Sequence, residues 1–249
     1  MKVLYAIQGT GNGHLSRAEE IVPILNKYVD TTVLVSGNQS QIQSNFEINY
    51  KKTGLTFLSG KTGKIDLLRT VFKSHPIDFI NEIRQFPISN FDLVITDFEP
   101  VSAWSALMHG VPCIEMSHQA AVINSKAPKS KIENRIGKYI LNHYCPTKEK
   151  IGFHFESYDN TIFTPVIRSS IRESEPKNMG HYTVYLPAYH DDILLQFLKQ
   201  FPVKWEVFSK YSKNKWQQDN VHFFPIDKTC FNKSFTNSTG VLCGAGFEL

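Results

Sequence analysis

The feature that most constrains the fold is the opening of the chain, where an apolar run, three glycines and a histidine follow one another. Residues 2–7 are apolar apart from Lys2, which is typical of a buried parallel strand. Glycines stand at positions 9, 11 and 13, His14 comes next, and apolar residues at helical spacing follow over 15–28. A glycine-rich turn between a strand and a helix presents unpaired backbone N–H groups, which bind anions. The opening therefore predicts a βαβ fold with a ligand site at its first turn.

Two better-known glycine motifs do not fit this turn. A dinucleotide fingerprint requires a glycine where His14 stands, and an acidic residue where the second strand ends in Ser36, Gly37 and Asn38. A nucleoside-triphosphate loop requires a lysine after the last glycine, and none follows Gly13. These departures argue against NAD-dependent enzymes and P-loop NTPases. Taken alone, the glycines are also compatible with a purely structural tight turn.

Composition narrows the class of protein further. A chain of 249 residues, 41% of them hydrophobic, has enough apolar side chains for one large core or two modest ones. Its net charge of +4 is mild and no basic run alternates with aromatic residues, so nucleic acid is not an expected partner. The four cysteines match no metal-binding spacing and are expected to be reduced. The chain begins with a core strand rather than a signal peptide, and no apolar segment is long enough to span a bilayer. We therefore expect a cytoplasmic protein.

The chain divides into two α/β parts. Strands and helical patterns alternate over residues 1–167, as βαβ units require. Residues 168–180 are polar and lack a periodic apolar face, which is typical of an interdomain linker. A fresh αβ pattern then covers 181–249 and stops at a glycine-rich turn, so we expect this second parallel-sheet domain to be incomplete.

An ordered set of motifs resembles a known enzyme group. The set comprises G-T-G-N-G-H at 9–14, the strand 92–97 followed by Phe98-Glu99-Pro100, Gly110-Val111-Pro112, and Ser117-His118-Gln119. In this order the motifs resemble those of GT-B glycosyltransferases, nearest to the MurG-like and UDP-glycosyltransferase-like group of bacterial sugar transferases. The resemblance is close over 1–167 and looser over 181–249.

The resemblance implies an architecture and a reaction. Two Rossmann-like parallel-sheet domains would face each other, the N-terminal one binding the acceptor and the C-terminal one a nucleotide-sugar donor such as a UDP-sugar. No cofactor or divalent metal is expected, because backbone N–H groups and a helix dipole stabilise the departing diphosphate in such enzymes. The pair Asp191-Asp192 fits a charge at the start of a helix better than a metal site.

His14 occupies the position that deprotonates the acceptor hydroxyl in related transferases. An attacking alcohol must lose its proton, and imidazole titrates near neutral pH. Asp97, at the carboxyl end of a strand, would orient the imidazole, and Glu99 is the rival partner. The alternatives are structural: His14 would only cap or pack, and Asp97 would be the N-cap of helix 100–109.

The resemblance assigns further residues to the two substrates. Arg17 would neutralise a phosphate on the acceptor or lie on a solvated face, and His118 is open to a structural role. The acceptor site would comprise Gly9, Thr10, Gly11, Asn12, Gly13, Ser16, Arg17, Glu99, His118 and Gln119. The donor diphosphate would be approached by the turn of Gly244, Ala245, Gly246, Phe247 and Glu248. The chain ends before the helix in which the family places a ribose-binding acid, so we expect an incomplete donor pocket.

A basic cluster lies around the helical pattern of residues 131–145. It consists of Lys126, Lys129, Lys131, Arg135 and Lys138. Such a surface would suit peripheral contact with the inner membrane and a lipid-linked acceptor, whereas the plainer interpretation is a solvated face over an apolar stripe.

Three functions remain open from the sequence. The first is a metal-independent inverting glycosyltransferase, or the acceptor half of one, acting on a small-molecule, glycan or lipid-linked hydroxyl. The second is a nucleotide-sugar epimerase of the same fold, which would need additional carboxylates. The third is a non-catalytic, truncated binding protein that keeps the acceptor site.

Overall fold

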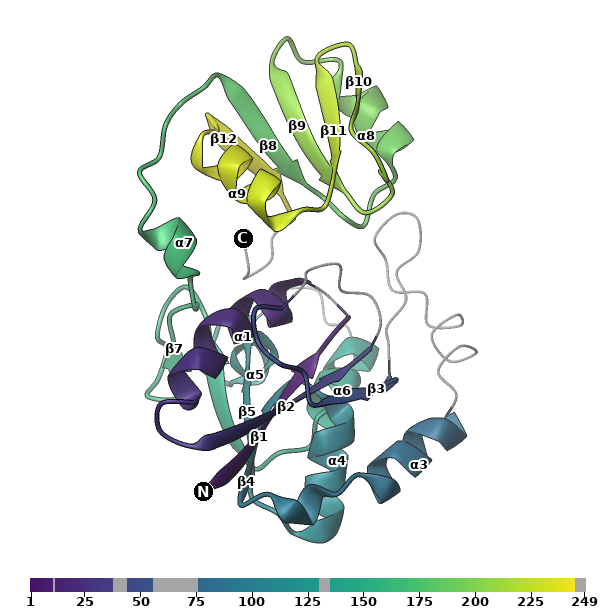
Figure 1. Cartoon of the computed structure of the whole chain (residues 1–249), viewed down its shortest axis with the longest axis vertical. Coiled ribbons are helices and arrows are strands. Elements are labelled where there is room, and N and C mark those ends of the chain that lie inside the picture. Colours follow the sequence, from purple (N-terminus) through teal and green to yellow (C-terminus); the bar gives the residue numbers. More distant parts are fainter. Residues whose placement is uncertain (11, 38–43, 56–75, 130–134, 245–249) are drawn as a thin grey trace. The chain divides into compact units, whose positions relative to one another are not determined.

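The structure is a computed structural model that describes residues 1–10, 12–37, 44–55, 76–129 and 135–244. Its described residues fall into two compact units, which divide between Val166 and Ile167 (Figure 1).

The first unit is an alternation of strands and helices. Its elements are β1 (Lys2–Gln8), α1 (Asn12–Leu25), β2 (Asp30–Ser36), β3 (Tyr50–Lys52), α3 (Pro76–Gln85), the 3-10 helix η1 (Ile88–Asn90), β4 (Leu93–Asp97), α4 (Pro100–His109), β5 (Cys113–Ser117), α5 (His118–Ile123), α6 (Arg135–His143), β6 (Glu149–Phe153) and β7 (Ile162–Phe163).

These strands form one parallel sheet in the order β3-β2-β1-β4-β5-β6-β7. β1 lies between β2 and β4, with Tyr5 opposite Val33 on one side and Ile95 on the other. After β3 the chain returns to the far side of β1, so the strand order reverses between β1 and β4. At such a reversal the connections leave in opposite directions, and the crevice at the carboxyl ends of the two strands is where ligands bind in open α/β sheets.

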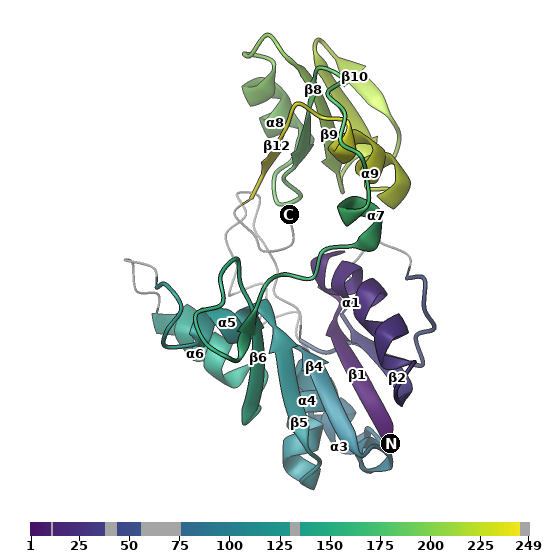
Figure 2. The same ribbon diagram turned by 90° about the vertical axis from the view of Figure 1, so that its left-hand side faces the viewer.

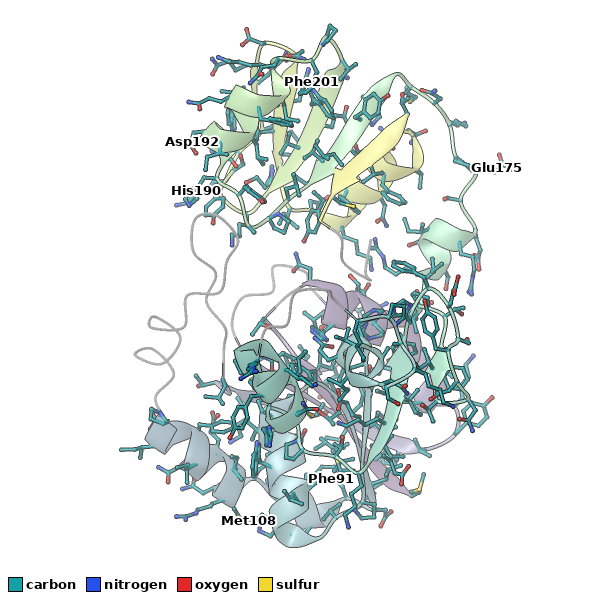
Figure 3. The ribbon with its side chains drawn as sticks, turned by 180° about the vertical axis from the view of Figure 1, so that it is seen from behind. Phe91, Met108, Glu175, His190, Asp192 and Phe201 are labelled. Atoms are coloured by element: carbon teal, nitrogen blue, oxygen red, sulfur yellow. The ribbon has the colours of Figure 1, made fainter. Side chains whose placement is uncertain are left out.

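The core of this unit lies on both faces of the sheet because side chains alternate along each strand. On one face, Tyr5 and Ile7 of β1 pack with Leu15 and Ala18 of α1, and Figure 2 shows α1 beside β1 and β2. On the other, Leu4 is clustered with Phe86, Ile88, Phe91 and Ala106, from the segments around α3 and α4. Figure 3 labels Phe91 and also Met108 on α4, which is exposed.

The bounds of α4 follow from local chemistry. Glu99 is the N-cap, Pro100 stands at the first helical position, and Gly110 ends the helix with a φ of 71°. Proline suits the first position because the missing N–H would be unpaired there, and glycine adopts a left-handed φ without strain. The sequence predicted this helix with the same bounds.

The second unit carries a five-stranded sheet. Its elements are α7 (Ser169–Arg172), β8 (His181–Tyr185), α8 (Asp191–Leu198), β9 (Lys204–Ser209), β10 (Trp216–Gln218), β11 (Val221–Pro225), α9 (Lys228–Thr236) and β12 (Gly240–Cys243). Val184, Val207, Phe223 and Leu198 lie in its core. Figure 3 marks His190 and Asp192 at the beginning of α8 and Phe201 past its end.

This second sheet is mixed rather than wholly parallel. Its order is β10-β11-β9-β8-β12, and β10 pairs antiparallel with β11 at the edge. The two strands are joined by a short turn in which Asp219 adopts a positive φ of 52°, a conformation that aspartate tolerates better than most residues. The sequence analysis expected parallel strands and did not anticipate β10.

The predicted linker 168–180 contains the short helix α7 and is hydrogen-bonded to α9. The N–H of Lys177 donates to the carbonyl of Thr236 at 2.9 Å, and that of Met179 donates to the carbonyl of Asn237 at 2.9 Å. The second half of this segment is therefore anchored to the second unit.

All four cysteines lie in the described part of the chain and are free thiols. Among the described helices, none combines the length and apolar character that crossing a membrane requires.

Candidate active site

His14 and Asp97 lie on neighbouring segments of the first sheet. His14 is in the first turn of α1, directly after β1, and Asp97 is the last residue of β4. Figure 2 shows β1 and β4 side by side, and their parallel register pairs Ile7 with Asp97. The turn after β1 and Asp97 therefore lie at the same carboxyl edge of the sheet. This is the point where the strand order reverses.

Arg17, one helical turn after His14, joins them in what we call the His14–Asp97–Arg17 triad. His14 Nδ1 lies 2.9 Å from Asp97 Oδ1. Arg17 Nε donates to Asp97 Oδ2 at 3.0 Å, and Arg17 Nη2 donates to Oδ1 at 2.6 Å and to Oδ2 at 2.8 Å. The side chain of His14 is 11% exposed, against 0% for Asp97 and 2% for Arg17. The imidazole is therefore the part of the triad that reaches the surface.

The contacts assign the proton on His14. Arg17 Nη2 lies 3.0 Å from His14 Nδ1, but it has two nearer acceptors in the oxygens of Asp97. The contact to Asp97 Oδ1 is the shorter of the two at Nδ1, and an ionised carboxylate is a strong acceptor. We therefore assign an Nδ1–H that donates to Asp97, so that in the neutral ring Nε2 is the nitrogen able to take a proton.

The triad is electrostatically tuned. Burial alone would raise the pKa of Asp97, but the charges and hydrogen bonds of Arg17 and His14 outweigh burial and hold that pKa at about 2. Burial and the charge of Asp97 also raise the pKa of Tyr5 on β1 well above its ordinary value. The Tyr5 hydroxyl is buried and has no hydrogen-bond partner among the described residues. With a pKa of about 2, Asp97 stays ionised at any pH near neutral.

Glu99, which the sequence allowed as the rival partner of His14, has another role. Its carboxylate caps α4, accepting from the N–H of Val101 at 2.8 Å and from that of Ser102 at 2.6 Å. The side chain is fully buried, and burial raises its pKa. Asp97 thus contacts His14, whereas Glu99 caps α4. Phe98, which lies between them, adopts a positive φ of 55°.

The glycine-rich turn is partly described. Gly9 is required by close packing, because a Cβ there would lie 2.8 Å from Val35 Cγ1 and 2.9 Å from the carbonyl oxygen of Ser36. Thr10, Asn12, Gly13 and Ser16 are half-buried at the end of the turn and the beginning of α1, and Gly11 lies outside the described residues.

Arg17 differs from one of the two alternatives that the sequence left open, the solvated face. Its guanidinium is buried, paired with Asp97, and lies 5.5 Å from the centre of the Phe153 ring. A buried, paired guanidinium lies on no solvated face. Its Nε and Nη2 bond the carboxylate of Asp97, and neutralisation of an acceptor phosphate by Arg17 stays a prediction.

His118 and Gln119 open α5, directly after β5. Ser117 caps this helix by accepting from the N–H of Ala120 at 3.0 Å. His118 Nδ1 lies 3.0 Å from the carbonyl oxygen of Phe153, and its side chain is buried. Gln119 is half-buried, and its Oε1 has no hydrogen-bond partner among the described residues. Phe153 therefore links α5 to the triad, because its ring also faces Arg17.

Sequence reasoning missed a second polar cluster at the same sheet edge. Gln8, the last residue of β1, is buried and donates from Nε2 to the Tyr144 hydroxyl at 2.9 Å and to the Leu55 carbonyl at 3.0 Å. Its Oε1 accepts from the Ser36 hydroxyl at 3.2 Å. A glutamine at the end of an otherwise apolar strand was the available signal.

The predicted donor turn and basic cluster lie partly outside the described residues. Gly244 is exposed after β12, whereas Ala245, Gly246, Phe247 and Glu248 are not described. In the cluster, Lys126, Lys129, Arg135 and Lys138 are exposed and Lys131 is not described. Lys129 donates to the carbonyls of Val122 and Asn124, and burial together with the charge of Lys138 lowers its pKa.

No group of three or more metal-ligating side chains occurs in the ranges that the structure describes. The triad itself consists of an imidazole, a carboxylate and a guanidinium in mutual contact at the carboxyl edge of a parallel sheet.

Comparison with known proteins decides the family. A family model described as Glycosyl transferase family 1 matches residues 1–249. The chain belongs to Glycosyl transferase family 1. It is therefore a glycosyltransferase, of the kind that transfers sugars from nucleotide-sugar donors, as the motifs predicted. A comparison with curated proteins finds no match.

Solved structures confirm the predicted GT-B fold. Arabidopsis thaliana UGT89C1 complexed with UDP has a TM-score of 0.56 at 14% identity, covering 99% of this chain and 75% of that chain. The glycosyltransferase SnogD from Streptomyces nogalater has a TM-score of 0.51 at 11% identity, covering 100% and 76%. A putative UDP-N-acetylglucosamine 2-epimerase from Listeria monocytogenes has a TM-score of 0.56 at 10% identity, covering 99% and 75%. Because an epimerase shares the fold, the fold alone does not separate the two activities, whereas the family match favours transfer.

Proposed function

We propose that this protein is an inverting glycosyltransferase in which His14 is the general base for the acceptor hydroxyl. The observation that carries the proposal is the 2.9 Å contact between His14 Nδ1 and the buried Asp97 carboxylate at the switch point of the sheet. The partly exposed imidazole stands over a carboxylate that stays ionised, which is the arrangement a base needs.

The reaction is a single displacement at the anomeric carbon. Nε2 of His14 accepts the hydroxyl proton, the acceptor oxygen bonds to the anomeric carbon, and the bond from that carbon to the diphosphate oxygen breaks. The nucleoside diphosphate leaves with the bonding electrons, and Asp97 stabilises the imidazolium that forms. Positioned general-base catalysis of this kind contributes about two to four orders of magnitude in rate.

The donor is proposed to be a UDP-sugar, because UGT89C1, which shares the fold, is complexed with UDP. Its diphosphate is proposed to meet backbone N–H groups at Gly244 and the residues that follow it, which would stabilise the leaving group without a metal. The acceptor is proposed to be a hydroxyl on a small molecule, a glycan or a lipid-linked sugar. UGT89C1 complexed with quercetin shows that this fold accommodates a small-molecule ligand.

A peripheral membrane contact through the exposed Lys126, Arg135 and Lys138 would suit a lipid-linked acceptor. Co-sedimentation with anionic vesicles at low salt, abolished by changing these three residues to glutamine, tests this part separately. Equal sedimentation of the variant would exclude it.

The test of the main proposal is a screen of UDP-sugars against panels of hydroxyl acceptors, read by mass spectrometry with EDTA present. We expect a glycosylated product, and NMR of the product should show the anomeric configuration inverted relative to the donor. Retention of configuration would contradict the proposal. Isomerised UDP-sugar in the absence of any acceptor would favour the epimerase instead.

A further inference from the structure

Arg17 contacts both His14 and Asp97 but takes no part in the proposed displacement. Its guanidinium is almost fully buried under the imidazole, bonds both oxygens of Asp97, and comes within 3.0 Å of His14 Nδ1. A buried cation is retained only where it is paired, and here both partners of the pair touch the same imidazole.

We propose that Arg17 is a positioning residue that fixes the orientation of Asp97 and offsets the field of Asp97 at His14, so that the imidazole stays in its unprotonated, base form. The inference rests on the proposed function of His14, but its physical part concerns the titration of the triad alone.

The orientation follows from the geometry of the fork. Nε and Nη2 of Arg17 are held at fixed spacing in one plane, and they engage Oδ2 and Oδ1 of Asp97 at 3.0 and 2.6 Å. The carboxylate therefore cannot rotate without breaking two charge-assisted hydrogen bonds. With Oδ1 fixed, His14 has its acceptor on the Nδ1 side, and Nε2 is the atom left for the substrate.

The charge balance follows from the distances. A carboxylate 2.9 Å from the imidazole favours the imidazolium, whereas a guanidinium 3.0 Å from the same nitrogen disfavours it. Among the described residues, the charged or titratable groups around His14 are Arg17 on α1, Asp97 on β4, Tyr5 on β1, which interacts electrostatically with Asp97, and His118 on α5, whose partner Phe153 also faces Arg17. Tyr5 stays neutral, so in the part of the chain that the structure describes the charged groups in contact with the ring are Asp97 and Arg17.

The test is an NMR titration of the His14 ring in isotope-labelled protein, which needs no substrate. In Arg17→Met, whose side chain is apolar and of similar length, we expect the pH midpoint of His14 to rise by about one to three pH units. Arg84→Met, which removes an exposed arginine of the same unit, should leave the midpoint in place. A midpoint in Arg17→Met within ~0.3 pH units of the wild type would overturn the proposal.

Kinetics supply a second readout. In Arg17→Met, the acid limb of the kcat profile should move to higher pH by as much as the NMR midpoint of His14 does, so that kcat is lost on the acid side and recovers on the alkaline side of that midpoint. The KM for the acceptor should stay nearly unchanged, because the Arg17 side chain is buried and paired with Asp97. An equal loss of kcat at every pH would mean that Arg17 is only structural.

Arg17→Lys keeps the test decisive if Arg17→Met does not fold. An ammonium keeps the charge but cannot engage both oxygens in the fork, so the carboxyl titration of Asp97 should move up by about one pH unit. An unchanged Asp97 titration in this variant would overturn the proposal. If wild-type protein transfers no sugar while the NMR midpoints move as stated, the proposed function fails and the inference on the triad stands.

Discussion

Asp97→Asn should destabilise the first unit in a pH-dependent way, because it removes the charge that the structure pairs with Arg17. At pH 7 the variant leaves a guanidinium, whose side chain is 2% exposed, without its carboxylate. Removing one partner of a buried pair costs about 3 to 5 kcal/mol. Because asparagine has the shape of aspartate, packing changes little, and the loss in free energy of unfolding measures the contribution of the charge.

The pH dependence follows from the pKa of Asp97. It is lowered from the ordinary value of 3.8 to about 2, so the ionised form stabilises the native state above pH 3.8 and this contribution is lost as the pH falls toward 2. A difference of nearly two pH units corresponds to about 2 kcal/mol at pH 7, of which about half has gone by pH 3.

The assay is urea unfolding followed by circular dichroism at pH 7 and pH 3. The difference in free energy of unfolding between wild type and Asp97→Asn should shrink by about 1 kcal/mol between the two pH values. Asp30→Asn, which changes an exposed aspartate of the same unit, should stay within about 0.5 kcal/mol of wild type. A difference that is the same at both pH values would refute the ion pair as the source of the stability.

Substitutions at three further positions test the packing around the site by urea unfolding. Tyr5→Phe removes a buried hydroxyl that has no partner among the described residues, so stability should rise by up to about 1 kcal/mol, and a loss would mean that the hydroxyl is bonded. Glu99→Ala leaves two N–H groups of α4 without their acceptor and should cost about 1 to 2 kcal/mol, with Glu99→Gln losing less; equal losses would argue against the cap. Gly9→Ala places a methyl group 2.8 Å from Val35 Cγ1 and should cost about 1 to 3 kcal/mol, whereas a neutral result would show that β1 and β2 separate easily.

Local patterns allowed much of the first unit to be predicted. The strand, glycine turn and helix over residues 2–25 and the helix 100–109 are signalled by short-range periodicity, proline and glycine. Pro100 predicts where this helix begins, because proline favours the first helical position and the residue before it, Glu99, is then the N-cap. Asp97 is therefore not needed as the cap and can contact His14. The sequence therefore contained the signal that Glu99 caps the helix and that Asp97 contacts another residue.

Contacts between distant segments were not predictable in the same way. Arg17 and Asp97 are 80 positions apart, and a helical arginine carries no local sign of a buried carboxylate partner. The Gln8–Tyr144 hydrogen bond spans 136 positions. The edge strand β10 forms because the turn at Asp219 brings it back to pair with β11. Its own three residues are all exposed. Such features are set by the tertiary fold, because no periodic apolar face marks them.

The role of His14 is tested most directly by the turnover of His14→Gln, compared with His109→Gln on an exposed histidine of the same unit. With the donor and acceptor that the screen identifies, we predict that kcat of His14→Gln falls by about two to four orders of magnitude, while calorimetry gives an unchanged donor affinity. His109→Gln should turn over at the wild-type rate. Wild-type kcat in His14→Gln would contradict the assignment of the base.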